Sequence, residues 1–350
     1  MIDQWEYTIH CITAAIGLFG LVGNVISLIV LTRPVMKSPS AILLALVAVF
    51  DTIIVLGHNS TRLMSDISSY NDCDLIDNYD SEFLVVIRYQ VLPFTIFWAN
   101  SLVNISLMAS MYLTLAMTLE RYFAVCHPFK FHEYCTYRRT CIHASAIVTF
   151  SILYNLSCFW ETEVVKETDG EGNISYDIKF TELNESELYN VLYRTWMHLI
   201  FNYLLPLTAI VTLNTAIYLE LKKVSRARQA LTNSQKNENR LTMMLLCVVV
   251  EFIVCTSVNG FFALWNTLRP SDFYIFELDV NVDINILLQP VSDFFTTFNS
   301  SVNFVTYVTF RGPFRRTLVD MFRCHKKNVK HLRSGDPEEQ SGSNSKDTPT

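Results

Sequence analysis

The sequence predicts an all-α membrane fold, a seven-transmembrane helix bundle with a short interfacial helix after span 7. Of the 350 residues, 51% are hydrophobic and only 17% are charged, whereas a soluble protein carries charge on about a quarter of its residues. The apolar residues also gather into seven blocks, and a bilayer core about 30 Å thick needs roughly 20 mostly apolar residues per helix. Because backbone groups in lipid must be hydrogen-bonded within the protein, blocks of this length are expected to be helices.

A short extracellular segment, residues 1–8, is expected to precede a transmembrane domain at residues 9–310. Its predicted spans are 9–32, 40–62, 90–120, 141–160, 192–219, 241–266 and 284–309. The first span has neither a basic leader nor a small-residue cleavage site, so we expect a retained helix and no cleaved signal peptide. Residues 311–324 are amphipathic and indicate an interfacial helix. The polar residues 325–350 indicate a disordered cytoplasmic tail that kinases can modify.

Charge sets the expected orientation. Lys and Arg gather in the loops after spans 1, 3 and 5 and at the start of the tail, and the positive-inside rule makes that side cytoplasmic. The amino terminus is therefore expected outside the plasma membrane. The opposite loops, 63–85, 161–190 and 267–283, carry six, nine and four acids. Either this acidity concentrates a cationic ligand, or the loops simply avoid Lys and Arg for topology.

Several residues are expected modification sites. The sequons at Asn173 and Asn184 lie in an extracellular loop and are predicted to be glycosylated. Cys324 follows the amphipathic run, where it is either S-palmitoylated or a free cytosolic thiol. Cys73 lies in an extracellular loop, where disulfides persist. The sequence has no Gly-rich phosphate loop, paired-His motif or Cys-x-x-Cys metal spacing, so we expect no enzyme and no nucleic-acid partner.

Polar residues inside the spans are informative because they are expensive in lipid. The relevant motifs are Gly23-Asn24-Val25 in span 1, Asp51 in span 2, Glu120-Arg121-Tyr122 at the end of span 3, Pro206 in span 5, and Asn303-Phe304-Val305-Thr306-Tyr307 at the end of span 7. In order and spacing, these motifs resemble the fingerprints of rhodopsin-like G-protein-coupled receptors.

The stretches 112–130, 135–139, 154–161 and 299–304 carry a narrower resemblance, to the invertebrate FMRFamide-related peptide receptors. The resemblance covers about residues 8–323. It implies a receptor for an extracellular neuropeptide, amidated and cationic, that signals to a heterotrimeric G protein when its cytoplasmic face opens. It also implies receptor kinases and arrestin as partners, the lipid bilayer as surroundings, and no required cofactor.

The resemblance assigns a coupling site to Glu120, Arg121, Tyr122, Phe129, Glu238, Asn303 and Tyr307. Arg121 is expected to pair with Glu238 when the receptor is inactive, and ligand binding would shift the population towards an open state. Phe129 is expected to dock into the G protein. The alternatives are a solvated loop acid at Glu238 and ordinary interfacial packing of Phe129.

A second implied site is a mid-membrane sodium pocket formed by Asp51, Ser110, Asn299 and Ser300. A buried carboxylate needs a counter-ion or a proton, so an allosteric sodium ion has a physical rationale. The alternative is a protonated Asp51 hydrogen-bonded to Asn24 and Asn303.

Ligand binding is expected in the outer halves of spans 3, 5, 6 and 7. The predicted residues are Trp98, Glu161, His198, Asn202, Asn259, Phe262 and Asp293, and each has interhelical packing as its alternative. If the ligand ends in Arg-Phe-amide, Asp293 or Glu161 would pair with the arginine. Val103 stands where aminergic receptors carry an Asp, which argues against a monoamine.

The sequence departs from the rhodopsin-like pattern in several places. Ile96 replaces the usual span-3 cysteine and loop 161–190 has no Cys, so the usual disulfide cannot form. Span 6 has Cys255-Thr256-Ser257-Val258 in place of Cys-Trp-x-Pro, which removes the usual source of a kink. Glu251 predicts either pH sensitivity or a hydrogen bond to a polar neighbour. A chemosensory receptor for a small molecule or lipid is therefore the alternative function. A transporter, which would show internal repeats, is a weaker one.

Overall fold

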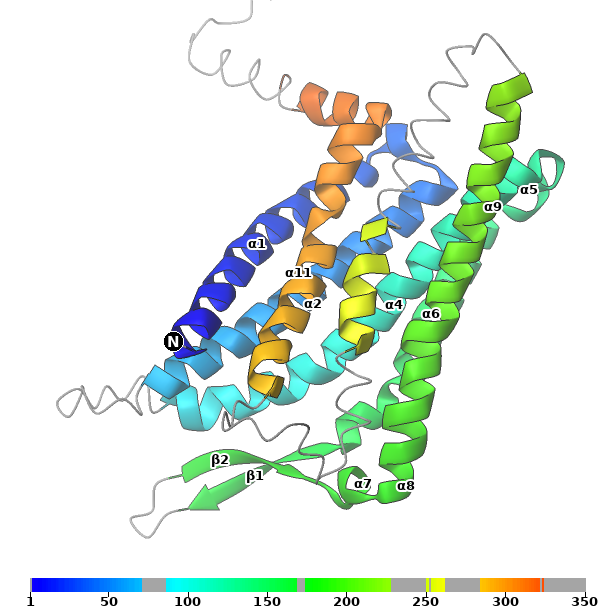
Figure 1. The fold of residues 1–350 in the computed structure, drawn as a ribbon. Coiled ribbons are helices and arrows are strands. Elements are labelled where there is room, and N and C mark those ends of the chain that lie inside the picture. The colour runs from blue at the N-terminus through cyan, green and yellow to red at the C-terminus, as the bar shows by residue number, and fades with distance from the viewer. Residues whose placement is uncertain are drawn as a thin grey trace, which may run out of the picture.

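The computed structural model describes residues 2–70, 86–168, 174–227, 250–251, 253–261, 284–321 and 323. Long helices dominate this part of the chain (Figure 1). They are α1 (Ile2–Leu31), α2 (Pro39–Tyr70), α4 (Leu92–Cys126), α5 (Pro128–Tyr134), α6 (Tyr137–Tyr154), α9 (Leu205–Ala227) and α11 (Ile284–Phe310). Shorter helical elements are η1 (Pro34–Met36), η2 (Ile87–Val91), η3 (Leu156–Trp160), α7 (Glu182–Glu185), α8 (Glu187–Tyr189), η4 (Asn190–Met197) and η5 (Ile200–Leu204). Residues 253–261 and 312–321 are also helical.

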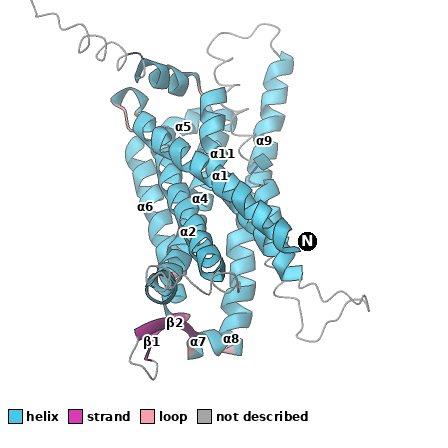
Figure 2. Cartoon of the chain, turned by 90° about the vertical axis from the view of Figure 1, so that its left-hand side faces the viewer, coloured by secondary structure: helices cyan, strands magenta, loops and turns pink. Residues whose placement is uncertain are grey.

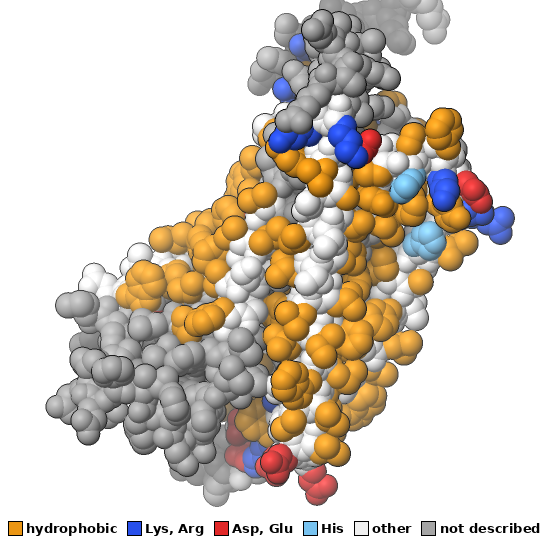
Figure 3. Space-filling model, turned by 45° about the vertical axis from the view of Figure 1, so that its right-hand side comes forward, with side chains coloured by type: hydrophobic (Ala, Val, Ile, Leu, Met, Phe, Trp, Pro, Cys, Tyr) orange, Lys and Arg blue, Asp and Glu red, His pale blue; other side chains and the backbone are white. Residues whose placement is uncertain are grey.

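Five segments of the described residues are long and apolar enough to cross a membrane: Gln4–Leu31, Pro39–Leu63, Tyr89–Cys126, Tyr137–Trp160 and Glu187–Lys223. They match the first five predicted spans. Helix α11 is long enough to cross a membrane but is more polar. Many of its Ser, Thr and Asn side chains are buried in the bundle. Residues 253–261 form part of the predicted sixth span, and the rest of that span lies outside the described residues. Figure 3 shows hydrophobic side chains over much of the described surface on the face in view, as a lipid-facing surface requires.

Several helices extend beyond the apolar blocks that predicted them. The expected extracellular segment 1–8 is part of α1 from Ile2 onwards, and α2 continues past the predicted end at 62 to Tyr70. Helix α4 runs to Cys126, and α9 runs to Ala227. Hydropathy marks only the stretch that needs lipid around it, whereas backbone hydrogen bonding continues a helix into polar surroundings. These helices therefore extend up to eight residues beyond the predicted spans.

Close packing of α1, α2, α4 and α11 forms the centre of the bundle (Figures 1 and 2). Gly20 lets α1 approach α11 so closely that an added Cβ would lie 2.1 Å from the hydroxyl oxygen of Ser301. A buried apolar cluster lies at the end of the bundle that holds Arg121, hereafter the Arg121 end. Its members include Val30, Leu31, Leu44, Leu113, Met117, Tyr307 and Phe314.

A β-hairpin covers the opposite end, hereafter the hairpin end. Strands β1 (Thr162–Thr168) and β2 (Ile174–Phe180) are antiparallel, where the sequence had predicted only a loop. The hairpin is attached by aromatic contacts, because the ring centroids of Phe94 and Tyr176 are 5.2 Å apart. No disulfide occurs among the described cysteines, which agrees with the predicted loss of the usual bridge.

The helical residues 312–321 follow α11 and support the predicted interfacial helix at 311–324. Phe314 is fully buried and packs edge-on against Tyr307, with ring centroids 5.8 Å apart. This contact fixes the short helix to the end of α11. Cys324 and the predicted tail 325–350 lie outside the described residues.

Candidate functional site

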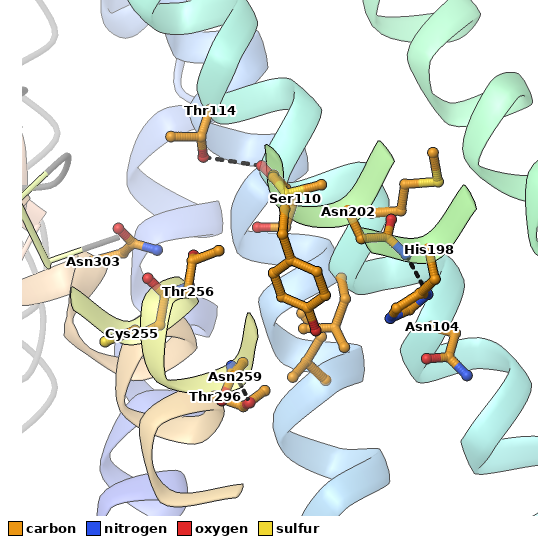
Figure 4. Close-up of a pocket in the computed structure, with 16 residues that line it drawn as sticks. Asn104, Ser110, Thr114, His198, Asn202, Cys255, Thr256, Asn259, Thr296 and Asn303 are labelled. Atoms are coloured by element: carbon orange, nitrogen blue, oxygen red, sulfur yellow. Dashed lines mark hydrogen bonds between the residues drawn. The ribbon is translucent and has the colours of Figure 1, made fainter. Parts of the chain in front are cut away.

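A polar cavity of about 130 Å³ lies between α4, α11, the helical residues 253–261 and the segment that joins η4 to η5 (Figure 4). Its wall contains the predicted ligand residues His198, Asn202 and Asn259, together with Ser110 and Asn299 of the predicted sodium pocket. The remaining wall residues are Ile54, Asn104, Leu107, Met108, Met111, Thr114, Tyr203, Cys255, Thr256, Thr296 and Asn303. Three of the predicted ligand residues and two of the predicted sodium-pocket residues therefore line the same cavity.

Two hydrogen-bonded pairs shape the wall of this chamber. The amide nitrogen of Asn202 lies 2.6 Å from Nδ1 of His198. An amide NH2 group only donates, so Nδ1 accepts and Nε2 carries the proton of a neutral ring. The Asn202 amide oxygen is buried with no hydrogen-bond partner among the described residues. Opposite, the Asn259 amide donates to Thr296 at 2.9 Å. An unpartnered buried acceptor favours a ligand that supplies an N–H or O–H donor.

The backbone around His198 and Asn202 departs from a regular α-helix. Elements η4 and η5 are π-helical, and such turns recur at functional sites. Tyr112 of α4 donates to the Phe201 carbonyl at 2.9 Å, which gives that oxygen a partner from outside its own helix. The π-helical turns were not predicted, because the only local signal in the sequence is Pro206, which lies in the first turn of the regular helix α9.

Asp293 is paired within the chain. It is nearly buried on α11 and accepts from both Nε and Nη2 of Arg62 on α2. Its other carboxylate oxygen accepts from the Gln289 amide at 3.0 Å and lies 3.9 Å from Nδ1 of His58. The acid predicted to receive a ligand arginine therefore already holds an arginine of the receptor.

Glu161 is paired in a similar way at the foot of the hairpin. Its side chain is buried and accepts from the Tyr189 hydroxyl at 2.7 Å, and Nη2 of Arg194 lies 3.9 Å away. The sequence pointed to both acids as candidate ligand residues, but the two arginines were not predicted as their partners. Arg62 carried a signal, since it is a basic residue at the outer end of span 2 next to a loop without Lys or Arg.

Trp98 and Phe262 do not contribute to the cavity wall as the structure describes it. Trp98 is 53% exposed and lies in an apolar surface groove between α2 and α4, with Leu56 and Leu102. Trp98 therefore stands apart from this cavity, and its role in ligand binding stays a prediction. Phe262 lies outside the described residues.

Asp51 is fully buried between α2, α4 and α11. Its carboxylate accepts from the Ser110 hydroxyl at 2.8 Å and from the Asn303 amide at 2.7 Å. Asn24 donates instead to the Ser300 carbonyl at 2.9 Å, so the expected bond from Asn24 to Asp51 is not formed. Carboxylate, hydroxyl and amide oxygens are the ligands that hard cations take, and these residues fit such an ion.

Glu251 lies in the described part of the predicted sixth span, where it is partly buried. One of its carboxylate oxygens is buried with no hydrogen-bond partner among the described residues. For this oxygen, the expected hydrogen bond to a polar neighbour is not found in the described part of the chain.

At the Arg121 end, three side chains form a compact polar cluster. The Ser40 hydroxyl donates to Glu120 at 2.6 Å, and Arg121 donates to Ser40 and lies 3.6 Å from Glu120. Tyr122 lies 3.2 Å from the imidazole of His127. Glu238, the predicted partner of Arg121, lies outside the described residues. The structure thus adds Ser40 to the predicted coupling residues.

Two further predicted coupling residues differ sharply in exposure. Phe129 on α5 is 98% exposed, whereas Tyr307 on α11 is 1% exposed. Phe129 makes little contact with the described part of the chain, so it is open to a G protein or to the membrane interface, and both predicted roles stay predictions. Tyr307 instead packs in the core beneath the short helix.

Comparison with known proteins gives a consistent family assignment. Residues 23–307 match the family described as 7 transmembrane receptor (rhodopsin family). The chain is 35% identical to the FMRFamide receptor of Drosophila melanogaster over 308 residues, which are 88% of this chain and 52% of that protein. It is 26% identical to the FMRFamide peptide receptor frpr-18 of Caenorhabditis elegans, over 88% of this chain and 68% of that protein.

A more distant similarity is to the rhodopsin of Alligator mississippiensis, with 22% identity over 97% of this chain and 87% of that protein. The chain spans about half the length of the Drosophila relative. The family match covers the helices that carry Asp51, Arg121 and Tyr307. The chain therefore belongs to the rhodopsin family of seven-transmembrane receptors, which are multi-pass membrane proteins rather than enzymes.

Proposed function

We propose that this chain is a G-protein-coupled receptor for an extracellular amidated peptide that contains arginine, of the FMRFamide type. The observation that carries the proposal is the 35% identity, over most of the chain, to a protein named FMRFamide receptor. The polar cavity and the two nearly buried acids, Asp293 and Glu161, supply the anionic and hydrogen-bonding groups that such a ligand needs. A cavity of about 130 Å³ is smaller than the roughly 300–1,000 Å³ of typical ligand pockets, so it would take one end of the peptide.

We place the hairpin end outside the cell and the Arg121 end in the cytoplasm. The basic loops predicted to be cytoplasmic join the helices at the Arg121 end, and Figure 3 shows Lys and Arg gathered towards that end. The peptide would enter from the hairpin end, and the G protein would meet Arg121 and the exposed Phe129. Receptor kinases and arrestin would act on the 325–350 tail. Asn173 and Asn184 are the proposed glycosylation sites, and Cys324 the proposed lipidation site.

Activation follows as a shift between two states of the bundle. A peptide can favour the open state only by the difference in its affinity for the two states. Arg121 is held by Glu120 and Ser40, and opening would release it towards the G protein. A hard cation such as sodium at Asp51 would stabilise one of the two states and so modulate peptide affinity.

The experiment is nucleotide exchange on purified G proteins, driven by the receptor reconstituted in lipid nanodiscs. FMRFamide should stimulate exchange by the wild type, and Arg121→Ala should lose this stimulation while still binding the peptide. The matched control is Arg138→Ala, which removes an exposed arginine at the same end. A receptor that responds to no amidated peptide with any G-protein class would refute the proposal. A response to a volatile or lipid instead would establish the chemosensory alternative.

A further inference from the structure

The Arg62–Asp293 pair joins α2 to α11 at the hairpin end of the bundle. The side chain of Asp293 is 9% exposed and that of Arg62 is 33% exposed. The guanidinium group therefore covers the carboxylate and is itself open to whatever enters from that end. The pair is bidentate on the arginine side, since Nε and Nη2 both donate to one carboxylate oxygen. Such pairs are among the stronger hydrogen-bonded contacts of proteins.

Asp293 stands one helical turn from the wall of the polar cavity. Thr296, which lines the cavity, follows Asp293 by three residues on α11, and residues three apart lie on the same face of a helix. Ser292, next to Asp293, donates to Asn259 in the cavity wall at 2.9 Å. A peptide whose end occupies the cavity would thus bring its neighbouring residue to Asp293.

We propose that Asp293 is the subsite for the arginine of the peptide, and that Arg62 occupies this subsite until the peptide displaces it. This inference rests on the proposed function, because it assumes a peptide ligand with arginine. A ligand guanidinium would reproduce both hydrogen bonds that Arg62 gives up. Gln289 and His58 remain beside the second carboxylate oxygen and would hold Asp293 in place during the exchange.

The exchange would make the receptor selective for peptides that contain arginine. A peptide without a guanidinium would have to leave Arg62 in place, or separate it from Asp293 and leave a nearly buried carboxylate without its partner, which is costly. The receptor then discriminates between peptides by the cost of displacing Arg62, as well as by the attraction of Asp293 for the arginine of the peptide. Displacement also breaks one of the polar contacts between α2 and α11, so binding at this subsite changes how these two helices are joined.

Glu161 fits this role less well. Its hydrogen-bond partner is Tyr189, whereas Arg194 lies 3.9 Å away and donates instead to Asn184 at 2.8 Å. The second pair is therefore a matched control for the first. Both pairs join a buried acid to a partly exposed arginine at the hairpin end of the bundle.

The experiment compares FMRFamide with its analogue in which citrulline replaces arginine, so that the ligand loses its charge but keeps nearly the same shape. Competition binding is measured on the full-length receptor in nanodiscs for wild type, Arg62→Met, Asp293→Asn and the control Arg194→Met. Each variant is scored by the ratio of its affinities for the two peptides, which cancels any loss of folded receptor.

Arg62→Met should tighten FMRFamide binding about tenfold if Arg62 fills the subsite roughly nine-tenths of the time, and should leave the citrulline peptide unchanged. Asp293→Asn should weaken FMRFamide at least thirtyfold, about the lower limit for truncating one partner of a buried charge pair, and again spare the citrulline peptide. Arg194→Met should not change the ratio.

Two results would overturn the inference while leaving a peptide receptor intact. One is equal affinity of the wild type for both peptides, and the other is a parallel weakening of both peptides by Arg62→Met, which would make Arg62 purely structural. Absence of any peptide response in the wild type would instead overturn the proposed function and the inference with it. Arg62→Lys should lie between Arg62→Met and wild type, because an ammonium keeps the charge but loses the bidentate contact.

Discussion

Replacing Gly20 by alanine should force α1 away from α11. A Cβ at this position would lie 2.1 Å from the Ser301 hydroxyl oxygen, 2.4 Å from Ser301 Cβ and 2.7 Å from Ser301 Cα. Because the last of these atoms belongs to the backbone, no change of rotamer makes room for the new methyl group. Overpacking typically costs about 1–3 kcal/mol, and we expect a loss of about 3 kcal/mol in the free energy of unfolding.

The glycines of the chain supply graded controls. At Gly17 the added Cβ would meet the amide end of Asn59 at 2.1 Å, and this side chain can rotate away, so the loss should be smaller. At Gly312 nothing lies within 4 Å. Gly312 is the first residue of the short helix and precedes Pro313, whose ring disfavours helical geometry in a preceding residue that has a Cβ, so Gly312→Ala should cost less than Gly20→Ala without stabilising the receptor.

The assay uses thiols that unfolding exposes. Cys158 is 7% and Cys255 is 2% exposed, so a fluorogenic maleimide should label them only as the detergent-solubilised receptor melts. At about 2–4 °C per kcal/mol, Gly20→Ala should melt about 6–12 °C below wild type. If Gly20→Ala and Gly312→Ala melt together, α1 and α11 do not approach closely here and the argument fails.

Three further results are expected. Phe129→Ala should lower peptide-stimulated nucleotide exchange at least about tenfold without changing peptide affinity or melting temperature, since its side chain is 98% exposed; normal exchange would place the G-protein contact elsewhere. Ser40→Ala removes the hydroxyl between Glu120 and Arg121 and should cost about 1–2 kcal/mol in the same thiol assay, and an unchanged melt would count against that cluster. Asp51→Asn should make peptide affinity the same in sodium and choline chloride, whereas a persisting sodium effect would put the ion at another site.

Hydropathy and motif spacing predicted the fold because each depends on local sequence. The apolar blocks located the first five spans to within a few residues at most ends, since lipid demands a nearly unbroken run of apolar side chains. The bonds from Ser110 and Asn303 to Asp51 also joined residues that the sequence analysis had singled out. A polar residue inside a span is costly, so the few that occur there marked the residues around Asp51 as a candidate site.

The contacts that were not predicted join residues far apart in the chain, which a single sequence does not reveal. Arg62 and Asp293 are 231 residues apart in sequence, and only the packing of α2 on α11 brings them together. Trp98 lies in a surface groove rather than at the cavity, and the sequence could not separate the two, because aromatic side chains suit both. The extensions beyond the apolar blocks escaped because hydropathy does not record where backbone hydrogen bonding ends.

The hairpin at the open end of the bundle is attached by ring contacts rather than by a covalent bridge. Contacts of the Phe94–Tyr176 kind are worth about 0.5–1.5 kcal/mol each beyond the area they bury. Reducing conditions leave such a contact untouched, whereas a mutation of either ring weakens it. A peptide that enters from the hairpin end would therefore meet a hairpin that only its own two chain ends tie covalently to the bundle.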